Sequence, residues 1–439
     1  MNFNLKNILS LLTIILISTL TLPSCQEDFD CGSMEANFND GCDDGDANTV
    51  DDIIQTDCTC AGTSTGQSNV EVLSQNITTD MTLTADKTWV LSGRISVESG
   101  ATLTIEPGTV IKGQAGTDVN ATSLLIARGA TLIADGRADA PIIFTSIADE
   151  ITPEQIASGD FGSPNLNPDV NGLWGGLLVL GNAVISASND NGDDISEVQI
   201  EGIPTSDANG LYGGNDDADN SGIIRYVSIR HGGSEIGSGN EINGLTLGGV
   251  GSGTVVENIE VVANQDDGIE WFGGTVDVFN AVIWNAGDDA IDTDQSWSGT
   301  LDNFAVITPN NSCFELDGPE GTFVAGHTIM NGSVVAVASG RVINASLIDV
   351  DSNTPVNMTN VHFVGPLSVD GNFLSMTEDE VDNSTFENVT FEIDAVDLGN
   401  LMGQGGSIPA GISAGGSPQA DVSVFDWTWA SDAGALMGL

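Results

Sequence analysis

The sequence predicts an all-β protein: a single-stranded, right-handed parallel β-helix (a solenoid) that follows a small N-terminal Cys-rich module. Short runs of Val, Ile, Leu and Thr, separated by Gly, Asn and Asp, recur from Val70 onward, and almost no segment has helical periodicity. Similar segments begin at Asn258, Asn280 and Asn303, which are spaced by 22 and 23 residues. Because three short strands and three turns use about 22 residues, this spacing predicts one β-helix coil per repeat.

Residues 1–24 have the features of a signal peptide. Lys6 precedes an apolar run over residues 8–22, which is shorter than the roughly 20 residues of a transmembrane helix. Residues 22–25, Leu-Pro-Ser-Cys, resemble the lipobox of bacterial lipoproteins, which implies that Cys25 is acylated and anchors the chain to a membrane. The acidic residues 26–30 resemble the export signal of Bacteroidota surface lipoproteins. We therefore expect a lipid-anchored, surface-exposed protein of the outer membrane, and a short anchor that is never cleaved is the alternative.

The charge balance excludes nucleic acid as a partner. The chain has nine Lys and Arg against 63 Asp and Glu, so its formal net charge is −54 and its field repels polyanions. The hydrophobic content of 40% is sufficient for a folded core. Carboxylate oxygens suit Ca²⁺, so calcium is the expected cofactor, and charge that serves only solubility is the alternative. Nothing in the sequence indicates the oligomeric state.

Residues 25–62 form the predicted Cys-rich module. Cys31, Cys42, Cys58 and Cys60 crowd this segment, and in an exported chain they favour two disulfides, with three pairings open. A zinc site is the rival interpretation. It is disfavoured because Cys58 and Cys60 lack the usual two-residue gap and because an oxidising compartment disfavours free thiolates.

The same module contains a candidate calcium loop. Asp44, Asp46 and Asn48 alternate as in such loops, and Asp52 completes the candidate ligand set. Thr49 stands where an EF-hand has Gly, so an EF-hand assignment fails. A looser calcium-stabilised module and a solvated acidic turn both stay open. The segment resembles the small Cys-rich spacer modules of Bacteroidota surface proteins.

Residues 63–69, rich in Ser, Thr and Gly, predict a linker, and residues 70–439 predict the β-helix with a C-terminal cap. We expect residues 425–429 and the Gly-rich residues 403–416 to cover the last coil. Residues 148–171 contain three prolines and predict a long surface loop. Cys313 is expected to point into the core.

An acidic column is the strongest functional signal. Ile269, Ile291 and Phe314 occupy matching positions and are predicted to point inward, so alternation sends their neighbours outward at about 4.8 Å spacing. Stacked like charges require raised pKa values or a bound cation. The predicted ligand-binding residues are Glu270, Asp292, Asp294, Glu315 and Asp317, with Trp271 and Trp297, and also Tyr212 and Trp284, as candidate sugar-stacking side chains. A solvated acidic ladder and ordinary Trp packing are the alternatives.

Two enzymatic chemistries compete for this face. For inverting glycoside hydrolysis, Asp266, Asp267, Asp288 and Asp289 lie on the adjoining turns, and residues 266–268 and 287–291 resemble the aspartate motifs of β-helical polygalacturonases. That family also carries an Arg-x-Lys, which this chain lacks. For calcium-dependent β-elimination, the candidate bases are Arg225, Arg230 and His231, predicted to share a groove with the acids.

Four segments, residues 173–181, 222–233, 241–249 and 267–274, resemble a family of β-helical outer-membrane lipoproteins with a pectin-lyase-like fold and with leptospiral and Bacteroidota members. The resemblance implies a fold and a location but no reaction. We therefore predict a surface lipoprotein whose acidic face binds calcium and a glycan or another surface ligand without catalysis. A polysaccharide hydrolase or lyase is the second interpretation, and a structural coat or adhesin the third.

Overall fold

The computed structural model describes residues 41–43, 49–55, 58–64, 69–236, 242–338, 341–365, 367, 374–375, 381–401 and 407–439. The chain divides into two compact units, one ending at Ser68 and one running from Asn69 to Leu439. In the first unit, β1 (Thr49–Ile54) pairs antiparallel with β2 (Cys60–Ser64). A disulfide joins Cys42 to Cys60, and Cys58 is disulfide-bonded as well.

Several predicted residues of the N-terminal module lie outside the described residues, namely Cys25, Cys31, Asp44, Asp46 and Asn48. Asp52 is described and lies on β1. Among the described residues, no helix combines the length and apolar character that a bilayer crossing requires.

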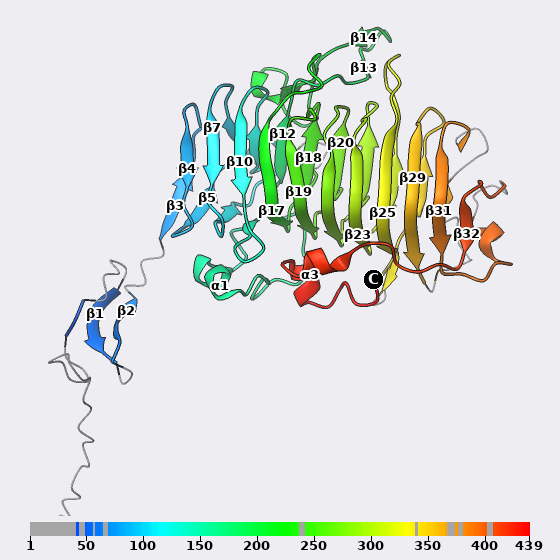
Figure 1. Cartoon of the computed structure of the whole chain (residues 1–439). Helices are drawn as coiled ribbons and strands as arrows, with labels where there is room; N and C mark the ends of the chain where they lie inside the picture. The colour runs from blue at the N-terminus through cyan, green and yellow to red at the C-terminus, as the bar shows by residue number, and fades with distance from the viewer. Residues whose placement is uncertain are drawn as a thin grey trace, which may run out of the picture. The chain divides into compact units, whose positions relative to one another are not determined.

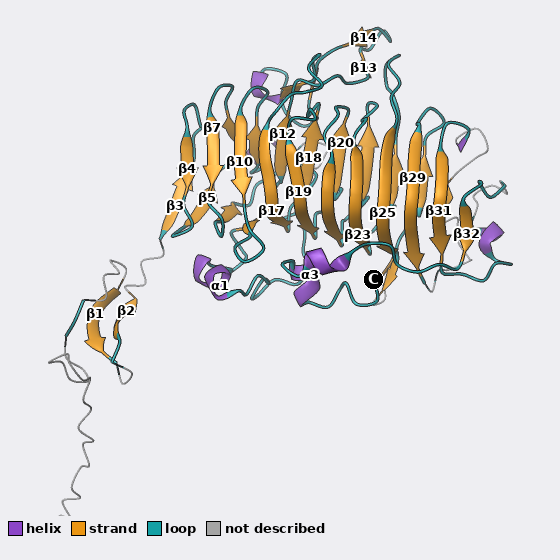
Figure 2. Cartoon of the chain, in the orientation of Figure 1, coloured by secondary structure: helices purple, strands orange, loops and turns teal. Residues whose placement is uncertain are grey.

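The second unit is the predicted parallel β-helix (Figures 1 and 2). Its larger sheet has 15 strands, which pair in parallel along the axis of the coil. These strands are β3 (Val70–Leu73), β4 (Met81–Leu83), β5 (Thr88–Leu91), β7 (Thr102–Ile105), β8 (Val110–Gly113), β10 (Thr131–Asp135), β11 (Ile142–Ser146), β17 (Gly222–Arg230), β19 (Val255–Val262), β21 (Val278–Trp284), β23 (Thr300–Ile307), β25 (His327–Val335), β29 (Val356–Val364), β31 (Thr385–Phe391) and β32 (Ile412–Ala414).

The second large sheet has nine parallel strands and carries the acidic column. Its members are β6 (Ile95–Val97), β9 (Leu124–Ile126), β12 (Leu177–Leu180), β18 (Leu245–Gly248), β20 (Ile269–Phe272), β22 (Ile291–Asp294), β24 (Phe314–Leu316), β28 (Ile348–Val350) and β30 (Leu374–Ser375). Each coil therefore contributes a short strand to this sheet and, in the middle of the chain, one long bent strand to the larger sheet.

The remaining elements lie in the connections. Three antiparallel hairpins are formed by β13 (Ala187–Ser188) with β14 (Asp194–Ile195), β15 (Val198–Gln199) with β16 (Leu211–Tyr212), and β26 (Val337–Ala338) with β27 (Arg341–Val342). The helices are α1 (Pro153–Ser158), α3 (Trp429–Asp432), η1 (Asp118–Asn120), η2 (Ala208–Gly210), η3 (Leu398–Asn400) and η5 (Val422–Phe425).

The long strands bend at a residue with positive φ. Asn258, Asn280 and Asn303 have φ values of 57°, 59° and 60°, a conformation that Asn tolerates better than most residues. Asn303 Nδ2 donates to Asn280 Oδ1 at 2.7 Å, and Asn388 bonds Asn360 in the same way at 2.9 Å. The repeated Asn therefore bends these long strands, and Asn–Asn hydrogen bonds link some neighbouring coils.

The register confirms the predicted period. Ile259 pairs with Ala281 and Ala281 with Phe304, at the predicted spacing of 22 and 23 residues. Inward side chains form one continuous core that includes Ile269 and, as predicted, the fully buried Cys313. This burial of apolar surface is the dominant stabilising contribution.

The sequence did not indicate one large insertion between β12 and β17, residues 181–221, which we call the covering segment. Ile200 and Tyr212 of this segment pack against Leu178 and Phe272 on the outer face of the nine-stranded sheet, in a small second core. Two ion pairs fasten the segment to early coils, one from Arg94 to Asp207 at 2.8 Å and one from Arg128 to Glu197 at 2.7 Å.

The two parts of the predicted C-terminal cap differ: β32, from the Gly-rich stretch, pairs with β31 at the end of the larger sheet, whereas residues 425–429 do not cover the last coil. Phe425 and Trp429 pack on the outer face of the larger sheet against side chains such as Val282, and Asp421 N donates to Asn303 Oδ1 at 2.7 Å. In Figure 1 the red C-terminal segment runs back alongside β23 and β25. Residues 421–439 therefore form a lateral strap, which we call the C-terminal strap, because the outer face of the larger sheet is apolar there.

Residues 148–171 also differ from a plain surface loop. They contain α1, whose N-cap Thr152 accepts from Gln155 N, and bury Ile156 and Phe161 against Val110 of the larger sheet.

Candidate metal and ligand site

The predicted stacking of the acidic column is found. Parallel pairing aligns Glu270 with Asp292, Asp292 with Glu315, and Glu315 with Asp349. The expected open face is wrong, however, since Glu270 is only 7% exposed and Asp292 only 9%. Val198 and Tyr212 of the covering segment face these side chains across a shared cavity, and the two-residue strands of that segment have no periodicity that would predict it.

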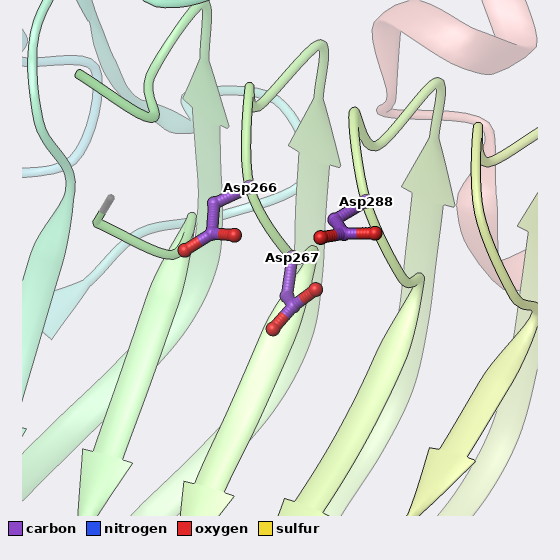
Figure 3. Close-up of side chains that lie close together, drawn as sticks. All are labelled: Asp266, Asp267 and Asp288. Atoms are coloured by element: carbon purple, nitrogen blue, oxygen red, sulfur yellow. The ribbon is translucent and has the colours of Figure 1, made fainter. Parts of the chain in front are cut away.

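The turns before β20 and β22 bring three carboxylates together. One oxygen each of Asp266, Asp267 and Asp288 lies within 4.8 Å of the others, and Figure 3 shows the three carboxylates converging from two successive coils. Asp267 also forms an equally tight group with Glu270 and Asp292, so it belongs to both clusters. Asp289 N donates to Asp267 Oδ1 at 2.9 Å, which orients the shared carboxylate.

Asp289 itself has a different role from the other three turn aspartates. Its side chain is 1% exposed, and its Oδ1 accepts a short hydrogen bond from Ser312 N of the next coil. This carboxylate therefore holds two turns together, whereas Asp266 and Asp288 are only partly buried.

A cavity of about 370 Å³ opens between the column and the covering segment. Six carboxylates line it, and no Lys, Arg or His is found among the described lining residues. The lining is Val198, Gln199, Glu201, Tyr212, Glu270, Phe272, Asp292, Asp294, Gln295, Asp317 and Glu320. The predicted ligand residues Asp294 and Asp317 therefore belong to this cavity, but Glu315 does not appear in its lining.

Burial and mutual repulsion raise the pKa values of these carboxyls. Desolvation, followed by neighbouring charges, raises the pKa of Asp267, Glu270 and Asp292 well above the ordinary range. Desolvation is also the main cause that raises the pKa of Asp294 to about 7 and that of Asp317 to about 6. At neutral pH the site therefore holds either protons or an external cation.

The basic residues predicted to share this groove lie elsewhere. Arg225 and Arg230 are on β17 of the larger sheet, where Arg225 pairs with Glu257 and Asp135. Arg230 is fully buried, as is Glu260, whose Oε2 accepts from Arg230 Nη2 at 3.3 Å. His231 is buried beside Trp429, and desolvation lowers its pKa.

The prediction of a shared groove is therefore wrong. Arg225 instead pairs with acids of neighbouring strands, and Arg230 pairs with Glu260 under the C-terminal strap.

The predicted sugar-stacking tryptophans are also corrected. Trp271 and Trp297 are 0% and 1% exposed and stack on each other inside the coil, with ring centroids 4.6 Å apart. The aromatic side chains at the cavity are Tyr212 and Phe272. Tyr212 is therefore the predicted sugar-stacking residue that does lie at the cavity, whereas Trp284 packs against Trp429 on the outer face of the larger sheet. Phe272 was missed, although alternation along β20 places it on the same side as Glu270.

The donor set fits a hard divalent cation. The ligand atoms in both clusters are carboxylate oxygens, which Ca²⁺ prefers, and sulfur and imidazole ligands are missing among the described residues there. Calcium accepts flexible geometry with several oxygens and water, which suits the partly exposed Asp266 and Asp288.

Comparison with known families assigns the fold. The model of the pectate-lyase like beta helix domain matches residues 75–402, which is more than half of the chain, so the protein belongs to this family. No curated protein and no solved structure matches the chain.

Proposed function

We propose that this protein is a cell-surface lipoprotein whose β-helix binds a glycan or another surface ligand, with calcium held by Asp266, Asp267 and Asp288. The observation that carries the proposal is the convergence of these carboxylates within 4.8 Å beside a cavity lined by six more. Without a cation, their mutual repulsion is relieved only by protonation.

The cavity supports ligand binding beside the ion. Its volume of about 370 Å³ falls in the range of small-molecule sites, and Tyr212 and Phe272 supply apolar surface among the polar side chains. A calcium ion at the turns offers open coordination positions to hydroxyl or carbonyl oxygens of a ligand. The signal sequence and Cys25 support display at the cell surface.

Calcium binding is tested by isothermal titration of the metal-free protein. We expect a calcium-dependent heat for the wild type and at least about tenfold weaker binding for Asp288→Asn, because one ligand oxygen loses its charge. Asp139→Asn makes the same charge change at an exposed side chain outside the site and is expected to bind like the wild type. Equal affinities for all three proteins would overturn the proposed site.

Polysaccharide cleavage is the second candidate function, and one observation favours it. Desolvation and a hydrogen bond with Asp289 raise the pKa of Glu315 to about 9, which keeps a carboxylic acid protonated near ionised groups. Against it, an inverting pair needs carboxyls roughly 6.5–9.5 Å apart, farther than the turn aspartates are. Reducing ends released from a polysaccharide panel, and lost in Glu315→Gln, would establish cleavage.

A further inference from the structure

A small annex adjoins the main cavity. Its volume is about 10 Å³, close to the space that one water molecule requires, and it shares Glu201 and Phe272 with the lining of the main cavity. Its other walls are mostly apolar, and its polar side chains besides Glu201 are Asn243 and Thr246. A single small polar group at the end of a larger ligand fits such a space.

Asn243 contributes an acceptor to the annex that no described side chain or backbone group satisfies. Its side chain is 2% exposed, and its Nδ2 donates a short hydrogen bond to Glu270 Oε2. Its Oδ1, in contrast, has no hydrogen-bond partner among the described residues. Because buried acceptors are nearly always satisfied, an unpartnered amide oxygen beside a cavity points to a donor supplied by a ligand.

The side chains that line the annex indicate which hydrogen-bond donor a ligand would place there. The annex presents three oxygen acceptors, on Glu201, Asn243 and Thr246, and the carboxylate of Glu270 lies against the Asn243 amide. A primary ammonium has three N–H donors and one positive charge, which match these acceptors. Phe272 also lines the annex, and an aromatic ring attracts a cation that lies over its face.

Other ligand groups fit less well. A divalent metal ion requires six or more oxygen ligands, which the mainly apolar annex does not supply. A carboxylated ligand meets six carboxylates and no described base in the main cavity.

We propose that the cavity binds a ligand carrying a primary ammonium group, such as an amino sugar, with the ammonium in the annex. This inference rests on the proposed ligand-binding function of the same site. The sugar ring then lies in the main cavity beside Tyr212, and the calcium ion at the turns is a separate part of the site.

Titration calorimetry on the full chain in detergent, with calcium present and at physiological salt, tests the proposal. The probes are glucosamine, N-acetylglucosamine and cadaverine. We expect glucosamine to bind at least about tenfold more tightly than N-acetylglucosamine, which has no charged donor. Cadaverine distinguishes the two sources of the group: binding equal to glucosamine identifies an alkylamine ligand, and weaker binding identifies an amino sugar.

Non-specific attraction to an acidic protein is removed by a charge-neutral variant. Asn243→Leu leaves the net charge unchanged and is expected to weaken glucosamine binding about tenfold, whereas Asn191→Leu, at an exposed amide, serves as the matched control. Equal binding of glucosamine and N-acetylglucosamine, or an unaffected Asn243→Leu, would overturn the inference. Calcium titration of the same variant keeps the two proposals apart, because an intact calcium response with no amine selectivity refutes only the ammonium.

Discussion

Two arginines on β17 show how much a side chain's surroundings decide its role. Arg225 is about one-third exposed and bridges Asp135 and Glu257. Arg230, five residues later, is fully buried, donates to Phe161 O at 2.6 Å and lies over the Trp429 ring at 5.1 Å. Arg230 therefore joins the larger sheet to the α1 loop and to the C-terminal strap, a structural role.

We expect Arg230→Met to lower the free energy of unfolding by about 3–5 kcal/mol, because it leaves the buried Glu260 carboxylate without its cationic partner, with only the hydrogen bonds from Ser228 and Ala430. The matched change Arg225→Met is expected to cost about 0–1 kcal/mol, as is usual for a partly exposed ion pair. Urea unfolding followed by near-ultraviolet circular dichroism measures both. Similar midpoints for the two variants would show that burial does not distinguish these ion pairs.

The alternation of inward and outward side chains along β20 already predicted that Trp271 is buried, although the functional interpretation placed it at the ligand. If Ile269 points inward, then Glu270 points outward and Trp271 inward again, and the structure has this order. A sugar-stacking role for Trp271 requires an outward side chain, and the structure shows an inward, fully buried one. Asn243 could not have been found in this way, because its importance comes from an unpartnered oxygen that only coordinates reveal.

At the scale of elements, the regular coils were predictable and the covering segment was not. The spacing of 22 and 23 residues determines the register of β20, β22 and β24, since each coil must bury its apolar residues against the next. The covering segment has hairpin strands of only two residues, too short to show any periodicity. It converts the predicted open acidic face into a cavity, so the column could be predicted and its burial could not.

The acidic column makes stability depend on pH and calcium together. Its carboxyls have pKa values raised in the folded state, about 7 for Asp294 and about 9 for Glu315, so their stabilising contribution is complete below the unfolded pKa and is lost as the pH rises through the folded value. Without calcium, we expect the melting temperature to fall between about pH 7 and pH 9. The histidines are neutral in this window and do not interfere.

Calcium is expected to reduce that fall, because the ion replaces protons as the compensating charge. Differential scanning calorimetry with EDTA or with millimolar calcium measures the effect. Asp292→Asn, which removes one charge from the column, is expected to reduce the fall in EDTA. A melting temperature that rises from pH 7 to pH 9 in EDTA would contradict the role given to these carboxyls.

At the scale of the whole molecule, the two units differ in what they contribute: the β-helix carries the stacked carboxylates, and the N-terminal unit carries the disulfides. The β-helix concentrates carboxylates in one stacked column because parallel coils repeat each outward position, which a less regular fold does not do. The N-terminal unit, in contrast, is small and depends on disulfides such as Cys42–Cys60.

The proposed lipid anchor predicts how the whole chain partitions between detergent and water. In the proposed lipoprotein, three acyl chains on Cys25 would exceed the two hydrophobic signals that stable membrane attachment needs, so the wild type is expected in the detergent phase of a Triton X-114 separation and Cys25→Ser in the aqueous phase. Cys313→Ser is the matched control: its thiol is buried in the coil, cannot be acylated in the folded chain and leaves partitioning unchanged. Mass spectrometry of the mature N-terminus distinguishes loss of the lipid from a failure of export. Detergent-phase recovery of Cys25→Ser with a processed N-terminus would show that another segment holds the protein at the membrane.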